Sequence, residues 1–157
     1  MTGFRRGTRL GIDVGKARVG VARCDPDGML AVPIETVPRS DASAARVLEL
    51  AAEYGAMEIL VGLPISLSGN ATSSTADARL FAEELGAASE LPIRLVDERL
   101  STVTAHAALR QSGRSQRSSR KIVDQVAAVV LLQQAIDVEK STGNPAGQPL
   151  TMTQEPR

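Results

Sequence analysis

Short apolar runs and amphipathic stretches alternate along the chain, and this pattern predicts its strands and helices. Two β-rich runs within residues 10–25 are separated by a glycine turn and predict a hairpin. A Pro- and Gly-containing turn at 25–28 leads to a third apolar run at 29–37, so we expect an antiparallel meander of three strands. Pro33 within that run suits an edge strand, which need not donate every ladder hydrogen bond.

From residue 40 onward the pattern changes to helices that alternate with continuous apolar runs. Ser40 or Asp41 can accept a hydrogen bond from the free amides of a first helical turn, and Gly55 stands where a C-terminal glycine belongs. The runs at 57–63 and 92–96 are typical of strands buried on both faces. A meander followed by this alternation predicts an α/β fold.

A helix is predicted between the two buried strands. Its apolar face is formed by Ala78, Phe81, Ala82 and Leu85. The Ser/Thr-rich segment 72–75 precedes this face, after a loop of small polar residues. Its amides and hydroxyls suit an anion such as phosphate, but helix capping explains the same residues, and the sequence leaves both interpretations open.

The last third of the chain is predicted to be helical up to a terminal tail. A short helix from Ser101 to about Gln111 is followed by a basic loop and by a long helix from about Arg120 to Glu139. After Ser141 no apolar period survives, which predicts disorder. The 157 residues fit one domain. The expected division is an N-terminal tail at 1–8, one domain at 9–140 and a disordered tail at 141–157.

Composition and charge narrow the classes of function. Aromatic residues make up 2% of the chain, which argues against binding of single strands by stacking on aromatic platforms. The formal net charge is zero, so attraction for a polyanion must be local. Between Glu98 and Asp124 no acidic residue occurs, and a solvated face is the alternative to a nucleic-acid contact there. The basic residues of this segment are Arg99, Arg110, Arg114, Arg117, Arg120 and Lys121.

The single cysteine and the N-terminal segment bear on the compartment. One cysteine, Cys24, excludes an internal disulfide and a cysteine cage for zinc, and we expect a buried thiol. The first ten residues contain no apolar signal region, and no run approaches the length of a membrane span. We therefore expect a cytoplasmic protein without a membrane partner.

Three acidic residues stand where a purely structural role would be costly. Asp13 ends the first strand, Glu98 follows the strand at 92–96, and Asp124 begins the apolar face of the last helix. The carboxyl ends of parallel strands line the ligand crevice of an open α/β sheet, so Asp13 and Glu98 are expected on one rim. A helix packed across that rim would add Asp124. Three oxygen ligands suit Mg²⁺ or Mn²⁺, and such a site can hydrolyse a phosphodiester.

Each of these acids also has a structural interpretation. Asp97 and Glu98 could pair with Arg99 or cap the next helix, and Asp124 could interact with the helix dipole. Because Asp97 and Glu98 are adjacent, the sequence does not decide which of them faces the metal.

Four segments, taken together, resemble the motifs of a known family. LGIDVGKARVGVARCD, LVGLPISLSG, LVDERLST and KIVDQVAAVVLLQQAID, in this order and spacing, are similar to the motifs of the YqgF/RuvX family of RNase H-like proteins. The resemblance covers about residues 9–137. It implies an α/β, RNase H-like fold: a five-stranded mixed sheet, made of the meander and two parallel strands, with helices on both faces. It also implies a Mg²⁺-dependent nuclease site formed by Asp13, Glu98 and Asp124.

The resemblance implies two roles: processing of the 5′ end of pre-16S ribosomal RNA, and resolution of Holliday junctions. We expect a metal-dependent endonuclease with the first role, the second being the alternative, and a structured RNA or a four-way DNA junction as substrate. A binding module without catalysis is a third interpretation, which the presence of all three acids disfavours. The first motif also resembles the phosphate-binding hairpin of actin-like ATPases, but this chain is too short for their repeated domain.

Basic residues are expected to hold the nucleic acid. Lys16, Arg18 and Arg99 lie near the acids in sequence and are expected to contact the scissile strand. A homodimer would suit a substrate with two-fold symmetry. The residues expected to contact backbone farther out are Arg114, Arg117, Arg120 and Lys121.

Overall fold

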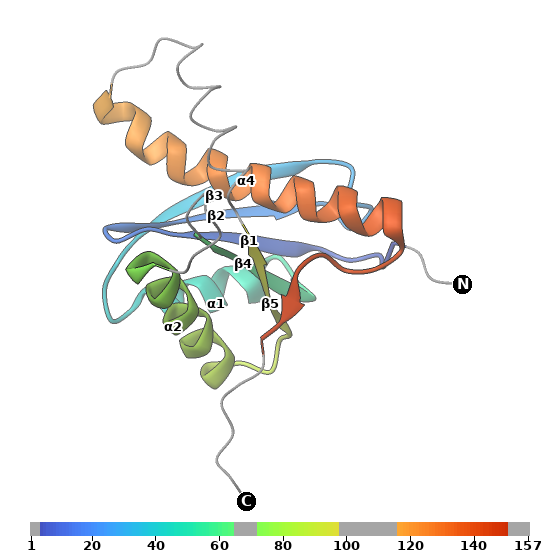
Figure 1. Cartoon of the computed structure of the whole chain (residues 1–157), viewed down its shortest axis with the longest axis horizontal. Helices are drawn as coiled ribbons and strands as arrows, with labels where there is room; N and C mark the ends of the chain where they lie inside the picture. Colours follow the sequence, from blue (N-terminus) through green and yellow to red (C-terminus); the bar gives the residue numbers. More distant parts are fainter. Residues whose placement is uncertain (1–3, 65–71, 98–115, 151–157) are drawn as a thin grey trace, which may run out of the picture.

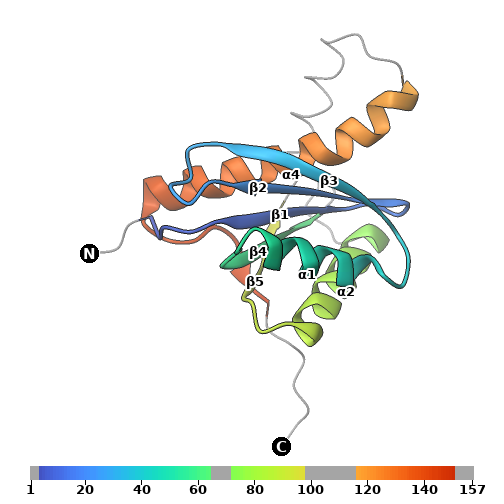
Figure 2. The same cartoon turned by 180° about the vertical axis from the view of Figure 1, so that it is seen from behind.

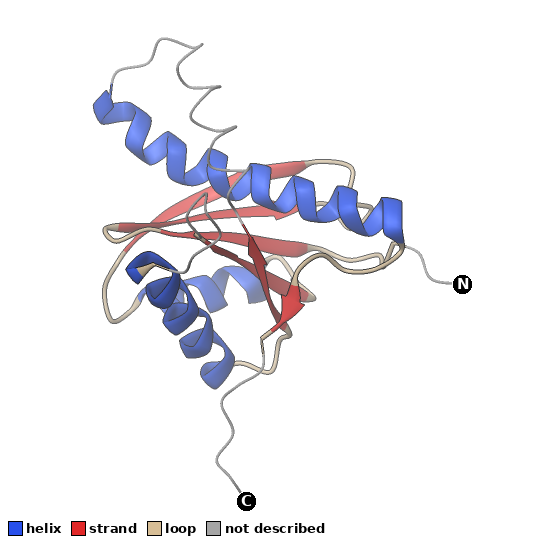
Figure 3. Ribbon diagram, viewed as in Figure 1, coloured by secondary structure: helices blue, strands red, loops and turns tan. Residues whose placement is uncertain are grey.

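A six-stranded mixed sheet separates one long helix from two shorter ones (Figures 1 and 3). The computed structural model describes residues 4–64, 72–97 and 116–150, and for 116–124 it describes the backbone only. The strands lie in the order β3-β2-β1-β4-β5-β6. They are β1 (Arg9–Val14), β2 (Arg18–Cys24), β3 (Ala31–Pro38), β4 (Glu58–Leu63), β5 (Ile93–Asp97) and β6 (Gln148–Pro149).

The first three strands form the predicted antiparallel meander. Asp13 in β1 pairs with Gly20 in β2, and Gly20 pairs with Thr36 in β3. β3 is an edge strand, as Pro33 predicted, and the register of its pairing shifts between Val21 and Ala22. β4 runs parallel to β1, and β5 runs parallel to β4. The C-terminal ends of β1, β4 and β5 therefore lie at the same edge of the sheet.

Helices cover both faces of the sheet, as the family resemblance implied. α1 (Ser43–Glu53) and α2 (Ser73–Ala88) lie on one face, and α4 (Gln116–Thr142) crosses the other (Figure 2). The face that α2 buries includes Ala78, Phe81, Ala82 and Leu85. Within the described ranges, no helix combines the length and the apolar composition needed to cross a bilayer.

Alternation along β1 divides the core into two clusters. Leu10, Ile12 and Val14 are buried with residues of α1 and α2. The second cluster joins the sheet to α4, where Leu60 of β4 packs with Ala128 and Leu132. The remaining residues of β1, including Gly11 and Asp13, alternate with the first set and therefore face α4.

The helix ends confirm two of the predictions and correct a third. Gly55 has a φ of +63° just after α1, as a C-terminal glycine should. Thr72 caps α2 in a reciprocal capping box with Thr75. The predicted cap of α1 is wrong, because its N-cap is Ala42, without a side-chain cap bond. Ser43 instead closes this turn: its hydroxyl donates to the Pro38 carbonyl at 2.7 Å.

The C-terminal segment differs from its prediction. α4 continues to Thr142, and β6 pairs with β5 as a sixth strand. Arg94 of β5 donates hydrogen bonds to the carbonyls of Ala146 at 2.8 Å and Gly147 at 2.9 Å. The Arg94 side chain thus holds the main chain of the C-terminal segment against the edge of the sheet. A contact between segments so far apart leaves no signal in the local spacing of apolar residues. Residues 141–150 are therefore part of the fold, and 151–157 lie outside the described residues.

Candidate functional site

The first predicted acid, Asp13, is buried at the sheet edge where three parallel strands end. It is the fifth residue of the six-residue strand β1, and its exposed fraction is 9%. β4, the parallel neighbour of β1, ends at Leu63, which is paired in register with Asp97 at the end of β5. A carboxylate with so little exposure requires hydrogen-bond donors or a cation to offset the loss of hydration.

Helix α4 passes closely over the strand that carries Asp13. A Cβ atom on Gly11 would lie 2.9 Å from the Ala128 carbonyl oxygen and 2.9 Å from Cβ of Leu132. Only glycine permits this approach, because a real Cβ essentially never comes so close to backbone. The glycine two residues before Asp13 thus allows the helix to lie directly against the face on which Asp13 stands.

Contacts along α4 show that it runs antiparallel to β1. Arg9 donates from Nη2 to Oε2 of Glu139 at 3.0 Å, and Gly11 lies against Ala128. From Gly11 to Asp13 the strand advances about 6.6 Å. Four residues of helix advance about 6 Å. Position 124 of the α4 backbone, one turn before Ala128, is therefore at the level of Asp13.

A second contact supports the same alignment. The side chain of Gln125 donates from Nε2 to Oγ1 of Thr36 at 2.6 Å. Thr36 pairs with Gly20, and Gly20 pairs with Asp13, so the three residues form one row across the sheet. The helix thus crosses the sheet over the row that contains Asp13 at the residue next to position 124.

Asp97 lies on the opposite face of the sheet from Asp13. Ile93 and Leu95 of β5 belong to the core cluster beneath α1 and α2, and Asp97 has the same parity in the strand. Val96, with the other parity, packs against the cluster beneath α4. The α4 face of the sheet is the one that Asp13 shares.

The turn between β1 and β2 carries two of the predicted basic residues. Lys16 is exposed in this turn, and Arg18 begins β2 in a half-buried position. Gly15 is required here, because a Cβ on it would lie 2.8 Å from the Arg18 carbonyl oxygen. Both cations are therefore within a few residues of Asp13 along a tight hairpin.

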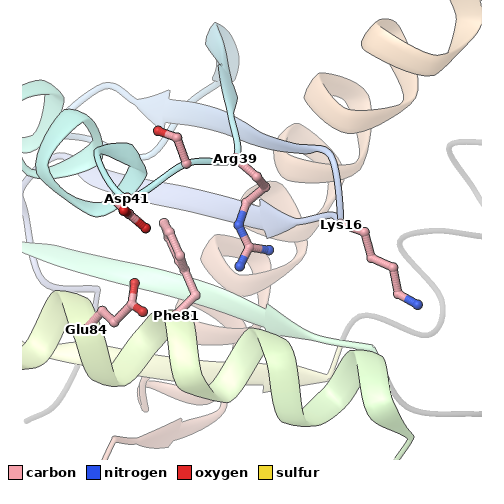
Figure 4. Close-up of a pocket in the computed structure, with 6 residues that line it drawn as sticks. Lys16, Arg39, Asp41, Phe81 and Glu84 are labelled. Atoms are coloured by element: carbon pink, nitrogen blue, oxygen red, sulfur yellow. The ribbon is translucent and has the colours of Figure 1, made fainter.

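A pocket of about 400 Å³ adjoins this turn on the α2 side of the sheet (Figure 4). Arg39, after β3, donates to both carboxylate oxygens of Asp77 in α2, at 2.8 and 3.1 Å. This guanidinium holds the pKa of Asp77 below its usual range. The residues that line the pocket are Lys16, Arg39, Ser40, Asp41, Phe81 and Glu84.

Most of the other predicted site residues lie outside the described part of the chain. These are Glu98, Arg99 and Arg114, and also the side chains of Arg117, Arg120, Lys121 and Asp124, whose backbone belongs to α4. The predicted helix at 101–111 and the basic loop after it are also outside. Among the described side chains, no group of three His, Cys, Asp or Glu residues could hold a metal ion. Two of the three predicted ligands are not in that set.

The Ser/Thr-rich start of α2 acts as a cap in this structure. The Thr72 hydroxyl accepts from the Thr75 amide at 3.3 Å, and the Thr72 amide donates to the Thr75 hydroxyl at 2.9 Å. The Thr75 hydroxyl also contacts the Pro64 carbonyl. These bonds support the capping interpretation for the two threonines, while 65–71 lie outside the described residues.

Sequence reasoning missed Arg39 and Asp77. Their interaction joins a loop after β3 to the first turns of α2, 38 residues apart. An isolated Arg and an isolated Asp carry no periodic or motif signal at that separation. Only the folded arrangement pairs them.

The model of the RuvX family, described as a Holliday junction resolvase, matches residues 7–138. The chain belongs to the RuvX family. A relative from Clavibacter michiganensis subsp. michiganensis, named "Putative pre-16S rRNA nuclease", is 55% identical over 147 residues and covers 92% of this chain and 91% of its own. Relatives with the same name from Leifsonia xyli subsp. xyli and Streptomyces coelicolor are 54% and 51% identical, covering 98% and 92% of this chain and 98% and 89% of their own.

A solved structure shares the architecture. It is titled "T. thermophilus RuvC in complex with Holliday junction substrate", and it superposes with a TM-score of 0.55 at 18% identity, over 92% of this chain and 99% of that chain. This likeness confirms the RNase H-like fold that the motifs implied. Membership of the family confirms the prediction of a hydrolase that acts on phosphodiester bonds in nucleic acid.

Proposed function

We propose that the protein is a metal-dependent endonuclease that processes the 5′ end of pre-16S ribosomal RNA, with Asp13, Glu98 and Asp124 as its catalytic acids and metal ligands. The observation that carries this proposal is the burial of Asp13 on the face crossed by α4, at the level of position 124. A carboxylate buried at that point needs hydrogen-bond donors or a cation, and the two further acids that we propose beside it would give a cation a shared site. The relatives' shared name supports the RNA substrate.

The donor chemistry fits a hard cation. The three proposed ligands are all carboxylates, which suit Mg²⁺ or Mn²⁺. The chain has one cysteine and one histidine, which are too few for the cysteine and histidine ligand sets of zinc sites. Bound at these acids, the cation would supply Lewis-acid stabilisation of charge at the phosphodiester.

Glu98 is preferred to Asp97 as the second acid. The parity of β5 supports this choice, because Asp97 has the parity of the residues that face α1 and α2. A test compares Glu98→Gln with Asp97→Asn, and only the first is expected to abolish cleavage.

Basic side chains would bind the substrate around the acids. Lys16 is exposed on the turn two residues beyond Val14, where its ammonium can reach a phosphate near Asp13. Arg18, Arg99, Arg114, Arg117, Arg120 and Lys121 are proposed to hold more of the backbone. Such contacts make binding salt-sensitive, because each one releases counterions.

The test is cleavage by the purified protein with Mg²⁺ on a precursor 16S RNA and on a four-way DNA junction. Asp13→Asn is the matched variant, because it keeps the shape of the side chain and removes its charge. Cleavage of the RNA that is lost in the variant and in EDTA is the expected result. Cleavage that survives in either would refute the metal site, and binding without any cleavage would favour a passive binding module.

A second candidate is resolution of Holliday junctions. The description of the matching family favours it. The same assay separates the two, because preferential cleavage of the four-way junction would assign this role. A protein that cuts both strands of a symmetric junction would be expected to act as a dimer, which light scattering on the complex would detect.

A further inference from the structure

The turn beside the proposed catalytic acid has a backbone conformation that needs external support. Gly15 donates its amide to the Arg18 carbonyl at 2.8 Å, which leaves Lys16 and Ala17 as a two-residue loop. Such hairpin loops favour positive φ, because that conformation matches the twist of the strands. Neither Lys16 nor Ala17 has a positive φ. The local sequence therefore does not select this turn by itself.

Arg39 holds the turn at two points. Its backbone amide donates to the Ala17 carbonyl at 3.0 Å, and its Nη1 donates to the Gly15 carbonyl at 2.8 Å. These two carbonyls lie on either side of Lys16. One residue from the loop after β3 thus connects to both halves of the β1–β2 turn.

The side chain of Arg39 is itself held by α2. It makes the bidentate pair with Asp77, and its guanidinium lies 5.5 Å from the centre of the Phe81 ring. The two charged side chains are 24% and 33% exposed. A bidentate, partly buried pair fixes geometry better than an exposed one. Asp77 raises the pKa of Arg39, consistent with a firm pairing.

Figure 4 shows how this arrangement serves Lys16. Arg39 points toward α2, whereas the Lys16 side chain points away from Arg39. The ammonium of Lys16 thus stays available while the carbonyl before it is tied down. Asp13 lies on β1, two residues before Gly15, so a shift of the turn would be transmitted to the end of the strand that carries Asp13.

We propose that Arg39 is a positioning residue that fixes the β1–β2 turn to α2 and so sets the positions of Asp13 and Lys16 relative to the scissile strand. This inference rests on the proposed nuclease function. A misplacement of about 1 Å at a reacting group can cost about a hundredfold in rate. The loss of Arg39 is therefore expected to lower activity without unfolding the protein.

The experiment compares Arg39→Ala and Arg39→Lys with Arg46→Ala. Arg46 is a matched control, because it also forms a bidentate pair, with Glu35 at 2.7 and 2.8 Å, but lies on α1 and has no described bond to the turn. Arg39→Ala is expected to lower kcat/KM about tenfold to a hundredfold. Arg39→Lys should recover only part of the lost kcat/KM, because an ammonium cannot reproduce the bidentate hydrogen bonds of the planar guanidinium. Arg46→Ala should behave as the wild type.

Coupling to Lys16 distinguishes positioning from simple destabilisation. Lys16→Ala should weaken the wild type severalfold but add little to Arg39→Ala, since the two residues act through one turn. Additive effects, or an Arg39→Ala enzyme with unchanged kcat/KM, would overturn the inference.

Hydrogen exchange of the peptide that contains residues 14–19 gives a readout independent of activity. Arg39→Ala should speed exchange of the Gly15 amide at least about tenfold, as a local opening would, whereas Arg46→Ala should not. If the wild type cleaves neither substrate, the proposed function fails, and the exchange data still decide whether Arg39 holds the turn. Exchange of the Gly15 amide that is unchanged in Arg39→Ala would refute the proposal that Arg39 holds the turn.

Discussion

A buried group of charges holds the C-terminal half of α4 to the sheet, and its removal has a calculable effect. Arg9 is 1% exposed and donates to Glu139, which is 4% exposed, at 3.0 Å. Arg5 also donates to Glu139, through its backbone amide and side chain, at 2.9 Å. We take Glu139→Gln as the perturbation, because it keeps the size of the side chain and removes its charge.

Two independent arguments give the same loss of folding free energy for this substitution. Breaking a buried ion pair by removing one partner costs about 3–5 kcal/mol. Glu58 remains near Arg9, at 3.8 Å, so the lower end applies. Independently, the hydrogen bonds from Arg5 and the charge of Arg9 outweigh the effect of burial and lower the pKa of Glu139 from 4.5 to about 2. A displacement of that size corresponds to about 3 kcal/mol of stability at neutral pH.

The direction of the pH dependence follows from the lowered pKa. The contribution of Glu139 is fully present above the ordinary pKa of 4.5 and is lost as the pH falls through about 2. Glutamine does not titrate, so the difference between wild type and variant isolates this carboxylate. The difference should shrink to less than about half between pH 7 and pH 3.

Urea unfolding followed by far-ultraviolet circular dichroism measures the effect. With a slope of about 1.5 kcal/mol per molar urea, the midpoint of Glu139→Gln should fall by about 2 M at pH 7. Glu49→Gln is the control: Glu49 pairs with Arg46 on the surface and is 67% exposed, so its loss should cost less than about 1 kcal/mol. A Glu139→Gln variant as stable as the control, or a difference at pH 3 as large as that at pH 7, would refute the reasoning.

Two further predictions concern the packing beneath α4. Gly11→Ala should destabilise the fold by about 1–3 kcal/mol and impair cleavage, because its Cβ would press on the Ala128 carbonyl and force α4 away from Asp13; an unchanged urea midpoint would contradict this. Cys24 is buried, and burial raises the pKa of its thiol. The thiol should therefore react with a thiol reagent only after the protein unfolds. If the folded protein reacted as fast as the protein unfolded in urea, the buried position of Cys24 would be contradicted.

Much of the fold could be predicted from local sequence patterns. The hairpin, the edge strand marked by Pro33, the buried strand β4 and the apolar face of α2 follow from spacing alone, because side-chain period and turn chemistry are local properties. β5 is a strand as predicted, but it is buried on one face only, because Arg94 and Val96 on its other face are partly exposed. The cap of α1 was mispredicted because the helix begins only after Ala42, and the Ser40 hydroxyl accepts from the Ala42 amide at 3.1 Å in the turn before the helix. The pairing of β6 with β5 was missed because edge pairing depends on a partner 53 to 55 residues away in the sequence.

For the candidate site too, one part could be predicted from the sequence and another part depends on the folded structure. The sequence by itself determined which acids and cations were worth considering, because an acid at the end of an apolar strand or at the start of an apolar helical face breaks the local pattern. The tertiary structure decided that α4 crosses the row of Asp13, that Asp97 lies on the other face, and that Arg39 holds the turn. These relations depend on strand parity, helix crossing and main-chain hydrogen bonds between distant segments, and such contacts exist only when the chain is folded.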